Sequence, residues 1–397
     1  YQVTLVNGSL TITKAPLTIT ADDKTRTYGD ANPTFTGSIL GLKNGDGITA
    51  SYTTGATALT GVGTYAIVPT AVDSTPATLA NYQVTLVDGT LSITKAALTV
   101  TADDKTKVYG SANPTLTGSI VGRKNGDDIS ATYSTAAVDS SPVDDYDITV
   151  ALIDPDSRLS NYEVSVISGT LTVTKKGLTV TADDKSRTYG YANPSLTVSY
   201  SGFVLGQSAS VLGGSLSVTT TATASSDVGT YPITGSGQTS GNYAITYAPG
   251  TLSVTKAPLT VTADDKGRTY GYANPSLTVS YSGFVLGQSA SVLGGSPSVT
   301  TTATASSDVG TYPITAWGQT SGNYAITYAP GTLSVTKAAL TVTADHKSRT
   351  YGDANPALTV SYTGFVLGQT ASVLGGTLTV TTAATPASAV GTYAITA

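Results

Sequence analysis

Short stretches in which apolar and hydroxyl-bearing residues alternate recur along the whole chain. Leu259, Val261 and Ala263 alternate with threonines, and the same two-residue period returns in residues 277–281 and 324–328. Successive side chains of a strand point to opposite faces, so this period predicts strands with one apolar and one hydroxyl-bearing face. Turn-forming residues, such as the pattern Tyr-Gly-x-Ala-Asn-Pro, separate the stretches. The chain is therefore predicted to be all-β.

The strand pattern is itself repeated. A block reading Leu-Thr-Ile/Val-Thr-Ala-Asp-Asp/His-Lys, followed each time by a Tyr-Gly pair, begins at Leu17, Leu98, Leu178, Leu259 and Leu340. The spacing of 80 or 81 residues exceeds the ~20–45 residues of a solenoid unit and predicts tandem small domains. The third and fourth copies differ at only six aligned positions. Such near-identity indicates duplication, which favours a length or valency function over catalysis.

Each copy is predicted to form a β-sandwich-like domain of six or seven strands, with a grasp-like arrangement as the alternative. Residues 1–14 match the last strands of a copy and would belong to a preceding repeat or to a repeat of a neighbouring subunit. The expected repeats are 15–95, 96–175, 176–256, 257–337 and 338–397, the fifth of which lacks its last strands.

The junctions between copies contain no flexible Gly/Ser linker. Residues 252–255 run through Lys256, Ala257 and Pro258 directly into the next strand, which predicts nearly rigid coupling. The apolar positions also change parity across each junction, so the chain turns its apolar face over between domains. We therefore expect a linear, linker-free rod of domains of about 81 residues.

The first and last segments complement each other in sequence. Residues 1–14 align with 243–256, and the last copy stops at a position that aligns with Gly235. One interpretation is a window cut from a longer chain. The other is strand complementation, in which residues 1–14 of one subunit complete the open domain 338–397 of the next by β-addition. The candidate donor-strand contacts are Tyr1, Val3, Leu5, Leu10 and Ile12.

Composition excludes several classes of function. The chain has no cysteine, one histidine (His346) and a net charge of -5, so it has no disulfide framework, thiolate metal site or multi-histidine site. It has no basic run, which argues against nucleic acid as a partner. It also has no apolar stretch near the ~20 residues of a membrane helix. We expect a protein that is not an enzyme, with no catalytic residues and no metal site.

The cluster Asp22, Asp23, Lys24 and Arg26, with its equivalents in other copies, is the strongest candidate for a cation site. Carboxylates at a domain junction could bind Ca²⁺, but the adjacent cations would repel the ion and the usual calcium-loop spacing is absent. A turn held by local salt bridges is the favoured interpretation, and no cofactor is expected.

Two groups of aromatic residues have candidate roles. A tyrosine in Gly-Thr-Tyr is expected to be structural, with its hydroxyl bonded to the backbone as in a tyrosine corner. Trp317, Tyr191 and Tyr272 are the residues that suggest a glycan-binding platform. The expected structural tyrosines are Tyr65, Tyr231, Tyr312 and Tyr393.

The combination of Leu-Thr-Val-Thr-Ala-Asp-Asp-Lys, Tyr-Gly-x-Ala-Asn-Pro, Tyr-Ser-Gly-Phe-Val-Leu-Gly-Gln and Asn-Tyr-Ala-Ile-Thr-Tyr resembles the MBG repeat of the YGX type. The resemblance covers essentially the whole chain, although copies one and two depart from it at 37–46 and 118–127 and copy two also at 144–146. Repeats of this type occur in tandem in very large secreted or surface-displayed bacterial proteins, often beside haemagglutinin-like adhesin regions. The resemblance implies an extracellular structural or adhesive role and supplies no catalytic residues.

The leading hypothesis is a structural segment of a bacterial surface adhesin or biofilm matrix protein that forms a stalk or filament. Its expected partners are copies of itself, arranged head-to-tail or laterally. The alternative is a multivalent array in which each repeat binds host or matrix glycan, or a protein, weakly and valency supplies avidity.

Overall fold

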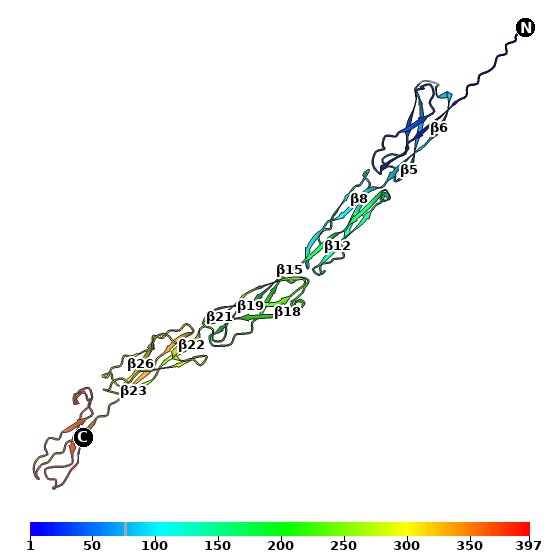
Figure 1. Ribbon diagram of the computed structural model, residues 1–397. Helices are drawn as coiled ribbons and strands as arrows, with labels where there is room; N and C mark the ends of the chain where they lie inside the picture. Colours follow the sequence, from blue (N-terminus) through cyan, green and yellow to red (C-terminus); the bar gives the residue numbers. More distant parts are fainter. Residues whose placement is uncertain (75–77) are drawn as a thin grey trace. The chain divides into compact units, whose positions relative to one another are not determined.

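The computed structural model describes residues 1–74 and 78–397, and its elements are β-strands and short 3-10 turns (Figure 1). The all-β prediction is confirmed. Two compact units divide the chain. The first comprises Tyr1–Leu178, Ser201–Gly214 and Gln238–Thr246. The second comprises Thr179–Tyr200, Ser215–Gly237 and Tyr247–Ala397.

Repeat 1, in the first unit, forms two sheets with the strand orders β3-β1-β6 and β2-β7-β5-β4. In both, a strand of the first half of the repeat pairs in parallel with a strand of the second half, β1 with β6 and β2 with β7. Its elements are β1 (Ala15–Ala21), β2 (Lys24–Thr27), β3 (Gly37–Leu40), β4 (Ile48–Thr53), β5 (Gly63–Asp73), η1 (Leu79–Asn81), β6 (Tyr82–Val87) and β7 (Gly89–Thr94).

The core of repeat 1 lies between its two sheets. Leu17 and Ile19 on β1 are fully buried and pack in one cluster with Ile48 of β4. The alternation of apolar and hydroxyl-bearing residues places the threonines of β1 on the other face, as the two-residue period requires. This two-layer arrangement is a sandwich rather than a grasp.

Repeat 2, also in the first unit, has the same topology, with sheets β10-β8-β13 and β11-β12-β14-β9. Its elements are β8 (Ala96–Ala102), β9 (Lys105–Val108), β10 (Gly118–Val121), β11 (Ser130–Ser134), β12 (Asp145–Ile153), η2 (Arg158–Asn161), β13 (Tyr162–Ile167) and β14 (Gly169–Thr174).

Repeat 3 contributes strands to both units. In the second unit, β21 pairs in parallel with β16 and antiparallel with β19, as the equivalent strands do in repeats 1, 2 and 4. Its elements are β15 (Lys176–Ala182), β16 (Lys185–Thr188), β17 (Val198–Ser201), η3 (Ala209–Val211), β18 (Gly213–Thr220), β19 (Gly229–Thr239), β20 (Tyr243–Ala248) and β21 (Gly250–Thr255).

Repeat 4 lies in the second unit and repeats the two sheets as β24-β22-β27 and β23-β28-β26-β25. Its elements are β22 (Ala257–Ala263), β23 (Lys266–Thr269), β24 (Val279–Ser282), η4 (Ala290–Val292), β25 (Ser298–Thr301), β26 (Gly310–Trp317), β27 (Tyr324–Ala329) and β28 (Gly331–Thr336).

In repeat 5 the described residues form two short strand pairs, β29 with β30 and β31 with β32. Ile395 is only half-buried, whereas the equivalent Ile314 of repeat 4 is fully buried in one cluster with Leu333 of the neighbouring strand β28. The elements are β29 (Thr341–Ala344), β30 (Val360–Thr363), η5 (Ala371–Val373), β31 (Thr381–Thr382) and β32 (Ile395–Thr396).

Within the first unit, one residue separates the last strand of repeat 1 from the first strand of repeat 2. β7 ends at Thr94 and β8 begins at Ala96. The buried positions are odd-numbered before the junction (Leu91, Ile93) and even-numbered after it (Leu98). The chain therefore passes from one sandwich core to the next through a change of face rather than through a linker.

Candidate functional site

The junctions between repeats contain the most elaborate arrangement of polar and aromatic side chains in the molecule. At the junction of repeats 1 and 2, Tyr28 of the Tyr-Gly pair is 1% exposed and meets Tyr162 edge to face, with ring centroids 5.5 Å apart. Both hydroxyls donate to one carboxylate oxygen of Asp127, over 3.1 Å from Tyr28 and 2.7 Å from Tyr162. One carboxylate of repeat 2 thus links a tyrosine of each repeat.

The glycine of the pair is required by close approach. Gly29 has φ +82°, and a Cβ there would lie 2.4 Å from Cβ of Lys124 in repeat 2. The aliphatic part of Lys124 lies against Gly29, and its ammonium reaches Asp30 over 2.9 Å. A side chain at position 29 would therefore both strain the backbone and push the two domains apart.

Backbone groups complete the contact at this junction. The amide N–H of Val62 donates to Oδ1 of Asn161 over 2.9 Å. The side chain of Asn125 donates to the carbonyl oxygen of Ala58 over 3.0 Å. Because these bonds satisfy main-chain groups at the domain end, they also fix the orientation of one domain on the other.

The junction of repeats 2 and 3 keeps the same plan with a neutral side chain. Tyr109 is 3% exposed, and its ring centroid lies 5.6 Å from that of Tyr243. Gln207 replaces the aspartate: its Nε2 donates to the Tyr109 hydroxyl (2.8 Å), and its Oε1 accepts from Tyr243 (2.6 Å). Val204 takes the position of the lysine, 2.2 Å from a Cβ built on Gly110.

The junction of repeats 3 and 4 in the second unit is built in the same way. Gln288 donates to the Tyr189 hydroxyl over 2.9 Å and accepts from Tyr324 over 2.6 Å. Oδ1 of Asn323 accepts from the amide of Val228 over 2.9 Å. The recurrence shows that the arrangement belongs to the repeat and not to one pair of domains.

Burial of the Tyr-Gly tyrosine falls along the last repeats. At the junction of repeats 4 and 5, Gln369 donates to the Tyr270 hydroxyl over 2.7 Å, and Tyr270 is half-buried. In repeat 5 the equivalent Tyr351 is 63% exposed, and a Cβ on Gly352 would have no neighbour within 4 Å. Repeat 5 therefore presents this half of a junction to solvent.

Loops of two different sequences make these contacts between repeats. Repeats 1 and 2 carry Lys-Asn-Gly-Asp, and repeats 3, 4 and 5 carry Val-Leu-Gly-Gln at the same position. In the charged type, burial and then the hydrogen bond to Asp127 raise the pKa of Tyr162 to about 12. In repeat 1 the hydrogen bond to Asp46 and then burial raise the pKa of Tyr82. Each carboxylate therefore favours the protonated form of its tyrosine.

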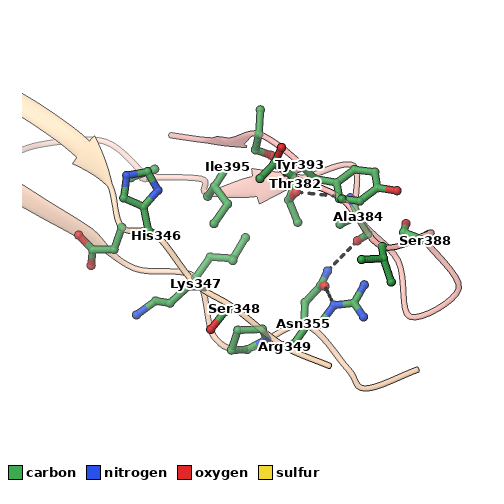
Figure 2. Close-up of a pocket in the computed structure, with 18 of the residues that line it drawn as sticks. His346, Lys347, Ser348, Arg349, Asn355, Thr382, Ala384, Ser388, Tyr393 and Ile395 are labelled. Atoms are coloured by element: carbon green, nitrogen blue, oxygen red, sulfur yellow. Dashed lines mark hydrogen bonds between the residues drawn. The ribbon is translucent and has the colours of Figure 1, made fainter. Parts of the chain in front are cut away.

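An open groove runs along repeat 5. Its volume is about 710 Å³, and Figure 2 shows the side chains that surround it, including Lys347, Tyr393 and Ile395. In repeat 4 the equivalent space is filled by β28, whose Leu333 pairs with both Lys266 and Tyr312. The groove thus lies where repeat 4 has β28.

The predicted donor segment, residues 1–14, is outside any assigned strand and extends away from repeat 1 at the N-terminal end (Figure 1). The five candidate contact residues are all highly exposed: Tyr1, Val3, Leu5, Leu10 and Ile12. The structure therefore shows these side chains without cover, and their pairing with a groove stays a prediction.

The four tyrosines of Gly-Thr-Tyr make one hydrogen bond in common. Each hydroxyl donates to the carbonyl oxygen four residues earlier, at 3.0 Å for Tyr65, 2.9 Å for Tyr231 and Tyr312, and 3.1 Å for Tyr393. The bond ties the loop before the long strand to that strand, which is the geometry that a tyrosine corner requires.

The Asp-Asp-Lys-x-Arg cluster is held mainly by hydrogen bonds, and the expected salt bridging is only partly correct. Asp22 lies 3.9 Å from Lys24, but Asp23 accepts from the backbone N–H of Thr90 over 2.7 Å. Arg26 pairs with no carboxylate; it donates to Oδ1 of Asn32 over 2.8 Å and to backbone carbonyls. It is 7% exposed, and a buried guanidinium needs this full set of acceptors.

The described residues contain no group of three or more metal-ligating side chains that could hold an ion. His346 is exposed at the edge of the groove in repeat 5 (Figure 2). Trp317, Tyr191 and Tyr272 are 47%, 59% and 61% exposed, respectively. None of the helical segments within 1–74 and 78–397 is long and apolar enough to cross a membrane.

Sequence reasoning did not identify the residues that join the domains. The Tyr-Gly pattern is predicted only as part of a turn, and the sequence pattern predicts no role for Asp127 or Asn161. The available signal was the co-occurrence, in every complete copy, of Tyr-Gly, of a loop ending in Gly-Asp or Gly-Gln, and of Asn-Tyr. Polar and aromatic residues that recur at turns in each copy indicate a contact that also recurs.

The fold and the junctions define a class of protein, a tandem array of small β-sandwich domains joined end to end without linkers. Within that class, the family model of the MBG domain (YGX type) matches residues 17–92, 98–172, 178–253, 259–334 and 340–397. The chain belongs to this family, as the sequence resemblance indicated. No curated protein matches it.

Solved structures with tandem β-sandwich domains are similar only at a low level. Drosophila N-cadherin EC1-4 has a TM-score of 0.20 at 8% identity, with 80% of this chain and 99% of that chain covered. The I9-I11 tandem of titin has a TM-score of 0.19 at 10% identity, with 60% and 98% covered. Similarities this weak carry no argument about the function of the chain.

Proposed function

We propose that the chain is a structural segment of an extracellular stalk or filament, in a large bacterial adhesin or matrix protein. The observation that carries the proposal is the recurring junction, in which a tyrosine from each of two successive repeats meets one side chain of the second. A contact rebuilt between successive domains restricts their bending, and restricted bending is what a spacer needs. The family supports an extracellular setting, because its repeats occur in tandem in large surface proteins.

Small-angle X-ray scattering of the full chain tests the stalk. We expect an elongated particle whose cross-section is that of a single domain. A matched variant, Tyr109→Ala with Tyr189→Ala, removes the shared ring at two internal junctions and is expected to shorten and broaden the distribution of dimensions. Tyr351→Ala, at the exposed equivalent position, is the control and should scatter like the wild type at a concentration at which the chain is monomeric. A compact wild-type particle would refute the proposal.

The stalk would be joined head-to-tail by strand complementation. Residues 1–14 would fill the groove of repeat 5, with Leu10 and Ile12 at the positions that Leu333 and Val335 occupy in repeat 4. Those two side chains are 0% and 3% exposed in repeat 4. Burial of Leu10 and of Ile12 would therefore each contribute about 1.5–3 kcal/mol to the free energy of binding. Tyr1, Val3 and Leu5 would lie in the other sheet of repeat 5, at the positions that residues of β27 occupy in repeat 4.

A synthetic peptide of residues 1–14 tests strand complementation with the full chain. It should bind, raise hydrogen-exchange protection in residues 341–350 and 391–396, and compete with self-association. The peptide carrying Leu10→Asp and Ile12→Asp is the matched control and should do none of these. Equal protection by both peptides would contradict strand complementation.

A second candidate is multivalent glycan binding, favoured by the exposed rings of Tyr191 and Tyr272 at the same position of two copies. Binding to a glycan array that falls in the Tyr191→Ala, Tyr272→Ala double variant would support this function. Binding that is absent, or unchanged in the variant, would exclude these rings as the platform.

A further inference from the structure

The residue after Tyr-Gly varies with the type of loop that follows it. Repeat 1 reads Tyr-Gly-Asp and meets the Lys-Asn-Gly-Asp loop of repeat 2. Repeats 2, 3 and 4 have Ser111, Tyr191 and Tyr272 at this position, and each meets a Val-Leu-Gly-Gln loop. An acidic residue thus accompanies the lysine-bearing loop, and non-acidic residues accompany the neutral loop.

The reason lies in the contact between Lys124 and Asp30. The lysine stem packs on Gly29, and its ammonium then lies 2.9 Å from the Asp30 carboxylate. A valine in the same place packs on the glycine and has no charge to satisfy, as Val204 does on Gly110. A carboxylate after Tyr-Gly therefore favours a following loop that carries lysine. Where this carboxylate is absent, a loop with valine at the lysine position fits.

Repeat 5 again reads Tyr-Gly-Asp, with Tyr351, Gly352 and Asp353 all exposed. Its face is already organised: Arg349 donates to Oδ1 of Asn355 over 2.8 Å, as Arg26 does to Asn32 in repeat 1. The face thus matches that of repeat 1, which receives a Lys-Asn-Gly-Asp loop.

The complementary half is present on repeat 1. Its Lys43 and Asp46 correspond to Lys124 and Asp127, and Tyr82 donates to Asp46 over 2.6 Å just as Tyr162 does to Asp127. Asp127 also accepts from Tyr28 of the preceding repeat. The corresponding acceptor position on Asp46 matches the hydroxyl of an incoming Tyr-Gly tyrosine.

We propose that the end face of repeat 5, formed by Tyr351, Gly352 and Asp353, is a docking surface for repeat 1 of a second copy of this chain. Asp353 pairs with Lys43, and the Tyr351 hydroxyl donates to Asp46. The inference rests on the proposed head-to-tail joining and adds what selects the partner: the charged loop of repeat 1 is accepted, and the Val-Leu-Gly-Gln loops of repeats 3, 4 and 5 are not.

Charge reversal in the full chain tests this surface. Self-association is measured by sedimentation equilibrium, and contacts are mapped by carbodiimide cross-linking followed by mass spectrometry. We expect a cross-link between Asp353 and Lys43. Asp353→Lys alone and Lys43→Asp alone should each weaken association by about tenfold or more, since each places like charges together. The double variant should recover it, and Asp88→Lys, between β6 and β7, is the control.

A mixture of the two single variants is the most discriminating part of this experiment. Both contacts between unlike chains are then complementary, and both contacts between like chains are repulsive. The mixture should therefore associate as far as the wild type does, although neither single variant does so alone. If the wild type associates and Leu10→Asp abolishes association, but the charge reversals change nothing, head-to-tail joining stands and the docking surface is overturned. If no association or cross-link is detected at the highest soluble concentration, both are overturned, and the stalk is judged by scattering alone.

Discussion

Truncation of Tyr28 to alanine is the most informative single perturbation, because this ring is shared by two domains. Its side chain is 1% exposed and packs edge to face on Tyr162. Burial of a large side chain is worth about 1.5–3 kcal/mol, and an aromatic pair adds about 0.5–1.5 kcal/mol. The hydrogen bond to Asp127 adds a further contribution. We therefore expect Tyr28→Ala to cost about 3–5 kcal/mol, the range found for large aromatic truncations.

The loss should appear in two repeats at once. In a linear array the interface energy is lost when either neighbour unfolds, so repeats 1 and 2 both depend on it. Hydrogen exchange measured peptide by peptide along a urea series resolves the repeats, and the sequences of repeats 1 and 2 are distinct enough to assign. With m near 1–1.5 kcal/mol/M for a small domain, the midpoints of both repeats should fall by about 2–5 M.

Two further variants separate the contributions. Tyr28→Phe keeps the ring and loses only the bond to Asp127, so it should cost about 1–3 kcal/mol. Tyr351→Ala removes the equivalent tyrosine where it is 63% exposed, and should change stability by less than about 0.5 kcal/mol. The reasoning is refuted if Tyr28→Ala lowers the midpoint of repeat 1 and leaves that of repeat 2 unchanged, because the junction would then not couple the domains.

Three further outcomes follow from individual contacts. Asp30→Asn breaks a partly exposed ion pair with Lys124 and should cost less than about 1 kcal/mol at low salt and nothing at high salt; a salt-independent loss, or an equal loss in Asp353→Asn, would contradict this. The raised pKa of Tyr162, about 12, means that its contribution is intact below the ordinary pKa near 10 and is lost as pH rises towards 12. The urea midpoint of repeat 2 should therefore fall in that window and fall less steeply in Tyr162→Phe; equal slopes would argue against it. Tyr312→Phe removes the bond to the carbonyl four residues earlier and should lower the stability of repeat 4 by about 1 kcal/mol, which an unchanged exchange midpoint would disprove.

The strands were predictable from the sequence because their signal is local. The alternation in 259–263 reflects one buried and one exposed face, and β22 has that burial pattern. The pairing was not predictable, because parallel partners such as β22 and β27 are separated by a whole domain of sequence. A two-residue period predicts which face of a strand is buried, but it does not determine which other strand pairs with it.

The junction site was harder to predict from the sequence, for a physical reason. Tyr28 and Asp127 are 99 residues apart, so no spacing within one copy connects them. Arg26 was assigned to a salt-bridged turn, because cations close to carboxylates in sequence usually face them. Its side chain instead lies inward, where Oδ1 of Asn32 and the carbonyl oxygen of Thr57 replace the carboxylate. The hydrogen-bond partners of Arg26 are therefore determined by the direction of its side chain and not by closeness in sequence.

The two loop types also explain which repeats can be copied freely. Gln207 both donates to one tyrosine and accepts from the other, so a Val-Leu-Gly-Gln junction is complete without charge. A repeat of this type fits before and after its own copy, and duplication leaves every junction paired. A Lys-Asn-Gly-Asp repeat brings an ammonium that needs a carboxylate such as Asp30 in the preceding repeat, so its insertion elsewhere leaves the lysine unpaired. The two copies that differ at only six positions, 176–256 and 257–337, both carry the neutral loop, as this argument requires.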